Sequence, residues 1–127
     1  MGNKRRVLIK LSGEMLSAPG KILDYEKIDA VAAVLKEISE RGVQQGVVVG
    51  GGNIMRGRAS GDIDRTDADH MGMLATVINA IALKDALLRI GAKAAVMSAI
   101  EMKQVCETFT KREAVERLEA GELVIFA

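Results

Sequence analysis

The apolar residues of the chain gather in short runs that are separated by longer, mixed segments. Four of these runs predict strands, at Val7–Leu11, Gly46–Gly50, Lys93–Met97 and Glu122–Phe126, and the first of them is rich in β-branched residues. The first is expected to be a short buried strand. The second is continuously apolar rather than alternating, which is typical of a parallel sheet covered on both faces.

Three mixed segments predict helices. One is expected between an N-cap at Asp24 and a terminating Gly42, because its apolar residues recur three and four positions apart. The others are expected at His70–Ile90, which Gly91 follows, and at Lys111–Ala120. Strands that alternate with helices imply right-handed crossovers, so we predict an α/β fold: a three-layer sandwich with a mostly parallel sheet.

The second predicted helix stands out because its central part, Met71–Leu83, is apolar on nearly all sides. The polar residues in it, Thr76 and Asn79, are three positions apart and share one face. We therefore expect this helix to be buried on more than one side, against a second subunit or against further sequence. The apolar run Val124–Ala127 at the end of the chain also favours a longer protein.

Charge and composition exclude several classes of function. The net charge of +1 provides no basic surface for nucleic acid or an anionic membrane, and one Tyr, two Phe and no Trp leave few platforms for stacking bases. The sequence also contains no run of 18 consecutive apolar residues, the usual sign of a membrane-spanning helix. A single cysteine, Cys106, excludes an internal disulfide, and with a single histidine it cannot form a zinc site. We expect a cytoplasmic protein.

Two segments are candidate phosphate-binding sites because each follows a predicted strand. Lys10 precedes a Ser-Gly turn, although a lysine there can simply be a solvated strand end. Gly50–Gly52 would let a phosphate approach main-chain N–H groups, with Arg56 as a cationic partner. The alternative is a turn that is flexible or that has positive φ. The spacing matches neither a P-loop nor a Rossmann dinucleotide site.

Asp69 is the third candidate. It is either the N-cap of the long helix or a carboxylate that accepts hydrogen bonds from ribose hydroxyls. Cys106 has no cationic neighbours in the sequence that would lower its pKa, and we interpret it as structural. The aspartates that alternate before the helix lack the glycine and terminal glutamate of a calcium loop, so no metal-binding residues are predicted.

Three stretches together resemble the bacterial uridylate (UMP) kinase family, a branch of the amino acid kinase fold. They are Arg6–Glu14 (RVLIKLSGE), Val47–Gly57 (VVVGGGNIMRG) and Asp69–Leu83 (DHMGMLATVINAIAL), in the order and spacing of the family. The resemblance covers nearly all of the chain, but the family continues into an acceptor loop and an adenosine-binding region. It implies that residues 1–127 are the N-terminal, UMP- and phosphate-binding half of such a domain, incomplete at its C-terminal end.

The resemblance implies transfer of the γ-phosphoryl group of ATP to UMP, giving UDP and ADP, with Mg²⁺ accompanying ATP. This chemistry needs no general base because the acceptor phosphate is already ionised. By matching position, Lys10 and Arg56 would be catalytic, and Gly51 and Asp69 would bind UMP. The residues that would contact ATP are Lys10, Leu11, Ser12, Gly13, Gly52 and Arg56.

The family also implies a homo-oligomer, a hexamer, and regulation by GTP and UTP. The GTP response would be placed at Ala18, Gly20 and Lys21, where the glycine pair expected of the family is missing. Two alternatives stay open. The chain could belong to another amino acid kinase, acting on a small carboxylate, or it could be a non-catalytic nucleotide-binding or oligomerisation fragment, with no activity in isolation.

Overall fold

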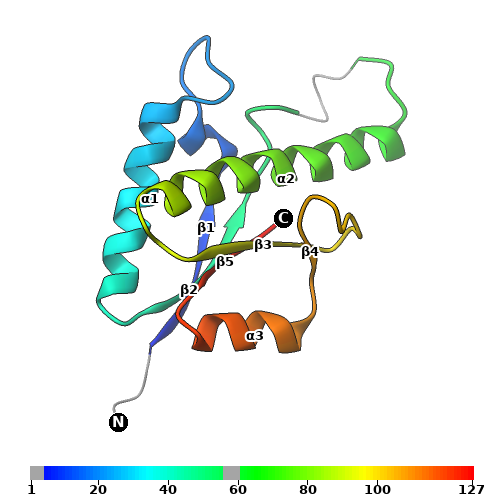
Figure 1. The fold of residues 1–127 in the computed structure, drawn as a ribbon. Coiled ribbons are helices and arrows are strands. Elements are labelled where there is room, and N and C mark those ends of the chain that lie inside the picture. Colours follow the sequence, from blue (N-terminus) through cyan, green and yellow to red (C-terminus); the bar gives the residue numbers. More distant parts are fainter. Residues whose placement is uncertain (1–4, 56–60) are drawn as a thin grey trace.

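A computed structural model describes residues 5–55 and 61–127. Its centre is a five-stranded parallel sheet with the order β1-β2-β5-β3-β4 (Figure 1). The predicted parallel α/β fold is thus confirmed, and β4 is a short strand that the sequence pattern did not predict. The strands are β1 (Arg6–Leu11), β2 (Gln44–Val49), β3 (Ala94–Ser98), β4 (Glu107–Thr108) and β5 (Leu123–Phe126).

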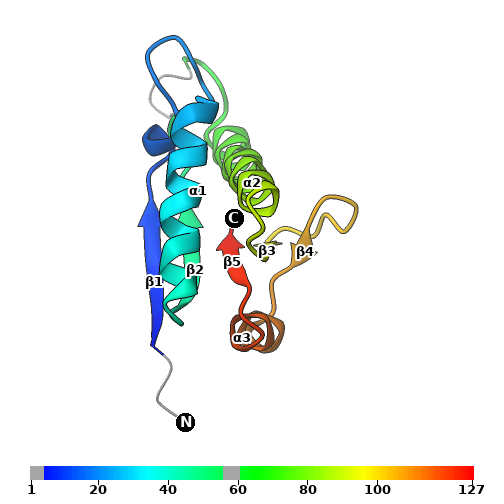
Figure 2. The ribbon, with the colours of Figure 1, turned by 60° about the vertical axis from the view of Figure 1, so that its left-hand side comes forward.

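Helices cover both faces of the sheet, as the three-layer prediction requires. The helices α1 and α2 pack together on one face, and α3 packs on the other (Figure 2). The central strand β5 shows this division, because Leu123 and Ile125 join the core under α1 and α2, whereas Val124 joins the smaller core under α3. The helical elements are η1 (Gly13–Leu16, a 3₁₀ turn), α1 (Tyr25–Glu40), α2 (Arg65–Arg89) and α3 (Lys111–Glu119).

The ends of α1 and α2 largely follow the predicted capping residues. Asp24 caps α1, and its side chain accepts a hydrogen bond from the N–H of Glu26 at 3.1 Å. Gly42 and Gly91 follow the two helices with φ of +84° and +87°, which confirms both predicted C-terminal ends.

The strand β1 differs from its prediction as a buried strand. It lies at the edge of the sheet, and its residues alternate between exposed and covered positions, with Leu8 69% exposed. The cause is the position of α3, which packs on β5 and β2 and leaves Leu8 uncovered. Ile9 and Leu11 face the opposite side and contribute to the main core.

The start of α2 was predicted wrongly. The helix begins at Arg65 rather than His70, and the side chain of Asp64 accepts hydrogen bonds from the N–H groups of Thr66 and Asp67 at 3.1 and 3.2 Å. Its first turn is polar and exposed, so apolar periodicity appears only after it. Asp69 therefore lies inside the helix, and its alternative role as the N-cap is wrong.

Within this chain α2 is buried on one face only. The opposite face exposes Met71, Leu74, Ile78 and Leu88, each by 45% to 50%. The expected cover of this face by a second subunit or by further sequence stays a prediction. Of the helices described, α2 is also the one that is long and apolar enough to cross a membrane by length and composition; here it packs against the sheet and α1.

The position of the α2 cap is open to test by stability. Asp64→Ala is expected to lower the free energy of unfolding by about 1 kcal/mol, because two N–H groups lose their acceptor. Asp69→Ala is the matched control on the same helix and should change it by less than about 0.5 kcal/mol, as an exposed substitution. Urea unfolding of both variants measures this. Equal losses in the two, or a larger loss for Asp69→Ala, would refute the assignment.

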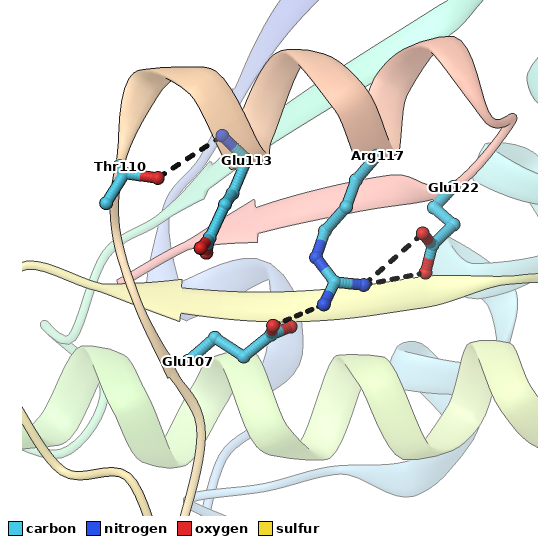
Figure 3. Close-up of polar contacts among 5 residues, drawn as sticks. All are labelled: Glu107, Thr110, Glu113, Arg117 and Glu122. Atoms are coloured by element: carbon cyan, nitrogen blue, oxygen red, sulfur yellow. Dashed lines mark hydrogen bonds and ion pairs between the residues drawn. The ribbon is translucent and has the colours of Figure 1, made fainter.

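Arg117 ties α3 to the neighbouring strands (Figure 3). Its guanidinium group pairs with Glu107 of β4 and with Glu122 just before β5, the latter at 3.1 Å. Partial burial would lower the pKa of Arg117, but the two carboxylates outweigh this and raise it. At the other end of α3, Thr110 accepts a hydrogen bond from the N–H of Glu113 as the N-cap. The cluster fixes the layer that covers the second face.

Candidate active site

The loops that follow β1 and β2 lie against each other at the carboxyl edge of the sheet. Leu11 is paired in register with Val49, and the N–H of Gly50 donates to the carbonyl of Leu11 at 2.9 Å. A Cβ on Gly50 would lie 3.4 Å from the nitrogen of Gly13. Ligands of open parallel sheets bind at this edge. The structure therefore brings together the two segments that the sequence singled out as phosphate-binding candidates.

The glycine loop, Gly50–Asn53, lies directly against α2. A Cβ at Gly51 would come 2.9 Å from the Cβ of Ala75 and 3.1 Å from the carbonyl oxygen of Gly72. Glycine is needed here for close approach and not for its backbone angle, because neither Gly50, Gly51 nor Gly52 has positive φ. The alternative interpretation of these glycines as a turn with positive φ is thus wrong, and their interpretation as a flexible turn stays open.

A pocket of about 400 Å³ opens between α2 and the end of β3. It is lined by Asp69 and Thr76 of α2, by Met55 and by Ser98 among others, and its volume lies within the range of small-molecule sites. Ser98 is almost completely buried, and its hydroxyl accepts the N–H of Ile100 at 3.0 Å, which shapes this wall. The lining is mostly apolar, and the carboxylate of Asp69 is a group in it that can accept a hydrogen bond from a sugar hydroxyl.

The predicted nucleotide contacts divide between this pocket and the neighbouring loops. Asp69 lines the pocket, and Gly51 packs against Gly72 and Thr76, which line it too. Lys10 is exposed near the carboxyl end of β1 and is not among the residues that line the pocket. The structure thus joins Gly51 to Asp69 through α2, while Lys10 stands at the adjoining strand end.

The remaining predicted ATP contacts follow β1 and β2. The side chain of Leu11 is buried in the core, so only its main chain reaches this edge. Ser12 is exposed, and its hydroxyl makes no capping hydrogen bond to η1. Gly13 is buried, whereas Gly52 is half-buried in a turn. Arg56 lies outside the described residues, so its predicted role stays a prediction.

The segment predicted for GTP forms a tight turn beside the glycine loop. Ala18 and Lys21 exchange main-chain hydrogen bonds of 3.0 and 2.8 Å around Pro19 and Gly20, and Gly20 has a φ of +77°. The next residue, Ile22, accepts a hydrogen bond at 2.9 Å from the side-chain amide of Asn53. The turn is therefore joined to the candidate phosphate site.

Sequence reasoning missed several residues that organise this edge. Asn53 and Asn79 join the glycine loop to α2 by paired amide hydrogen bonds. The signal was present, since Asn79 is polar within an apolar helix, but a pattern cannot name its partner. The ammonium group of Lys27 was also missed; it donates to the carbonyls of Ser17 and Glu14 at 2.6 and 3.2 Å and closes the end of η1.

The lone cysteine is consistent with its structural interpretation. Burial raises the pKa of the Cys106 thiol, and the nearby Lys84 offsets this only in part. The thiol is thus held in its protonated, unreactive form at neutral pH. Within residues 5–55 and 61–127, no three His, Cys, Asp or Glu side chains gather closely enough to hold a metal ion.

Comparisons with known proteins agree with this geometry. The chain is 49% identical over 126 residues to a uridylate kinase from Methylococcus capsulatus, which covers 97% of this chain and 53% of the relative. A UMP kinase structure from Ureaplasma parvum matches with a TM-score of 0.92 and 35% identity over 98% of this chain and 56% of its own. A UMP kinase structure from Bacillus anthracis matches with a TM-score of 0.91 and 35% identity, and the match covers 97% of this chain and 52% of that chain.

The predicted resemblance to UMP kinases is thereby confirmed, and the chain spans about half the length of the curated relatives it matches. The description of the amino acid kinase family matches residues 5–127, which is nearly the whole sequence. The parallel sheet, the glycine loop packed on α2 and these similarities lead to one conclusion. The chain belongs to the amino acid kinase family.

Proposed function

We propose that this chain forms the N-terminal, UMP- and phosphate-binding half of a kinase that transfers the γ-phosphoryl group of ATP to UMP. The observation that carries the proposal is the contact of Gly51 with α2, beside the pocket that Asp69 lines. This arrangement joins a loop of accessible main-chain N–H groups to a carboxylate suited to ribose. The similarity to uridylate kinases at about 50% identity supports UMP as the acceptor.

In this proposal the protein positions phosphates and neutralises their charge. Lys10, Ser12 and Gly13 would contact the phosphates of ATP, and Gly52 and Arg56 would complete that site. Phosphoryl transfer to an ionised phosphate requires little covalent chemistry from the enzyme, so positioning and charge stabilisation dominate. Mg²⁺ would be carried by the nucleotide phosphates and water, since the described residues bring no three His, Cys, Asp or Glu side chains together to hold it.

The proposal extends to assembly and setting. The apolar stripe of α2 (Met71, Leu74, Ile78 and Leu88) is left exposed by the described residues, which supports a homo-oligomer; a hexamer follows from the resemblance alone. By the resemblance, the turn of Ala18–Lys21 would receive GTP, and its link to the glycine loop through Ile22 would connect it to the candidate phosphate site. The cytoplasm is the proposed setting, where a lone thiol such as Cys106 stays reduced.

The role of Asp69 can be tested by binding. Asp69→Ala is expected to weaken the affinity for UMP about tenfold, because a ribose hydroxyl loses a charged acceptor. Wild-type protein should lose a similar factor for the 2′,3′-dideoxy analogue of UMP, whereas the variant should bind UMP and the analogue equally. Calorimetric titration of this chain measures all four affinities. If the variant still prefers UMP over the analogue, Asp69 does not hold the ribose.

The acceptor can be tested with a chimera in which the second half of a uridylate kinase relative follows Ala127. With ATP and Mg²⁺ the chimera is expected to form UDP from UMP and to leave acetylglutamate, aspartate and carbamate unphosphorylated. Preference for one of the carboxylate acceptors would favour the alternative amino acid kinase. A folded chimera that binds nucleotides without turnover would favour a non-catalytic module.

A further inference from the structure

The side chains of Asn53 and Asn79 form a closed pair of amides. The Nδ2 group of Asn79 donates to Oδ1 of Asn53 at 2.7 Å, and the Nδ2 group of Asn53 donates to Oδ1 of Asn79 at 3.1 Å. Each amide uses its second hydrogen on a main-chain carbonyl, Gly50 for Asn79 at 2.7 Å and Ile22 for Asn53 at 2.9 Å. All four N–H bonds of the pair are thus accounted for.

The burial of Asn79 makes this pairing costly to break. Asn79 is 0% exposed within a helix whose other buried residues are apolar, so its amide must find its partners inside the protein. A leucine or alanine would satisfy the core at this position without any polar partner. Core packing therefore does not explain the amide at this position, and its hydrogen bonds to the glycine loop do.

The pair holds both ends of the Gly51–Gly52 segment, in addition to the N–H groups of Ile54 and Met55, which both donate to the carbonyl of Gly51 at 3.0 Å. Gly51 and Gly52 have no side chains, and they lie between the carbonyl of Gly50 and the side chain of Asn53, both of which bond to Asn79. The loop after β1 rests on the same pair, because a Cβ on Gly13 would lie 2.2 Å from Oδ1 of Asn53. Both candidate phosphate loops thus contact the same pair of amides.

We propose that Asn53 and Asn79 are positioning residues that hold the Gly51–Gly52 segment in register for a nucleotide phosphate, without touching the nucleotide themselves. The proposal rests on the proposed function for the identity of the ligand, but the effect on the loop is independent of it. Without the pair, the glycine N–H groups are still present but are no longer held in a fixed position. The protein then loses affinity for the phosphate and keeps its contacts to the nucleoside.

The test compares Asn79→Ala with Leu87→Ala in this chain. Leu87 is also fully buried on α2, two turns further along, so its truncation destabilises the same helix without touching the loop. In ¹⁵N relaxation of the ligand-free proteins, the order parameters of Gly51 and Gly52 are expected to fall from about 0.85 to below about 0.6 in Asn79→Ala and to stay high in Leu87→Ala. Rigid glycines in Asn79→Ala would overturn the proposal.

A binding measurement separates positioning from general destabilisation. Asn79→Ala is expected to weaken UMP binding about tenfold while uridine binding changes less than about twofold, and Leu87→Ala should leave the ratio of the two unchanged. Equal losses for UMP and uridine in Asn79→Ala would overturn the positioning role. If the wild-type chain binds UMP no better than uridine, the proposed function fails, whereas the relaxation measurement still decides whether the amide pair holds the loop.

Discussion

Replacement of Lys10 by methionine is expected to lower kcat for phosphoryl transfer by about 10²- to 10³-fold in the chimera, because the developing charge on the transferred group loses its cationic partner. Methionine keeps the length and packing of the side chain and removes only the charge. Lys10 is exposed at the end of an edge strand, so the free energy of unfolding should change by less than about 0.5 kcal/mol. Steady-state kinetics with UMP and ATP, together with urea unfolding, measures both quantities.

The matched control for Lys10 is Lys93→Met. Lys93 is an exposed lysine beside the first residue of β3, at the opposite, amino edge of the same sheet. Its replacement removes the same charge from the protein and is expected to leave kcat within about twofold of the wild type. An equal loss in the two variants would show a general charge effect. Full activity in Lys10→Met would remove Lys10 from the mechanism and return it to a solvated strand end.

Gly51→Ala carries the second large expected effect. The new methyl group would meet the Cβ of Ala75 at 2.9 Å and main-chain atoms of Gly72 and Thr76 at 3.1 Å, so the glycine loop must move away from α2. A displacement of about 1 Å in a phosphate-positioning loop can cost about 10²-fold in kcat/KM. Overpacking of this contact is also expected to lower the free energy of unfolding by about 1 to 3 kcal/mol.

Gly72→Ala, on the face of α2 that Gly51 contacts, is expected to raise the free energy of unfolding, whereas Gly51→Ala lowers it. A Cβ at Gly72 meets no atom within 4 Å, and the residue lies inside α2, where alanine is favoured over glycine by about 0.5 to 1 kcal/mol. Urea unfolding should therefore show destabilisation for Gly51→Ala and stabilisation for Gly72→Ala. If Gly51→Ala is as stable as the wild type and keeps its kcat/KM, the close approach of the loop to α2 is needed for neither stability nor activity.

Much of the fold follows from local patterns, and its misses have identifiable physical causes. The strands at residues 46–50 and 122–126 were predictable because burial on both faces makes a strand continuously apolar. Burial of β1 was mispredicted because its place at the sheet edge depends on strand order, which no local pattern contains. The start of α2 was misplaced because a solvated first turn shows no apolar periodicity, although Asp64 is a good N-cap.

The candidate site divides in a similar way. Strand ends of a parallel sheet meet at one edge, so the proximity of the Lys10 segment and the glycine loop could be predicted. The pairing of Asn53 with Asn79 could not, because it joins residues 26 positions apart through side-chain amides. The structural reason for glycine at position 51 could not be predicted either. Close approach and positive φ both select glycine, and only the packing on α2 distinguishes the two.

We expect the contact between the glycine loop and α2 to hold the UMP-binding part of the site. A series of ¹H–¹⁵N correlation spectra of the folded chain titrated with UMP tests this. We expect saturable shifts of the amide signals of Gly51 and Asp69, with smaller shifts for uridine at Gly51. A folded chain in which millimolar UMP leaves both signals in place, or shifts only residues away from this edge, would contradict it.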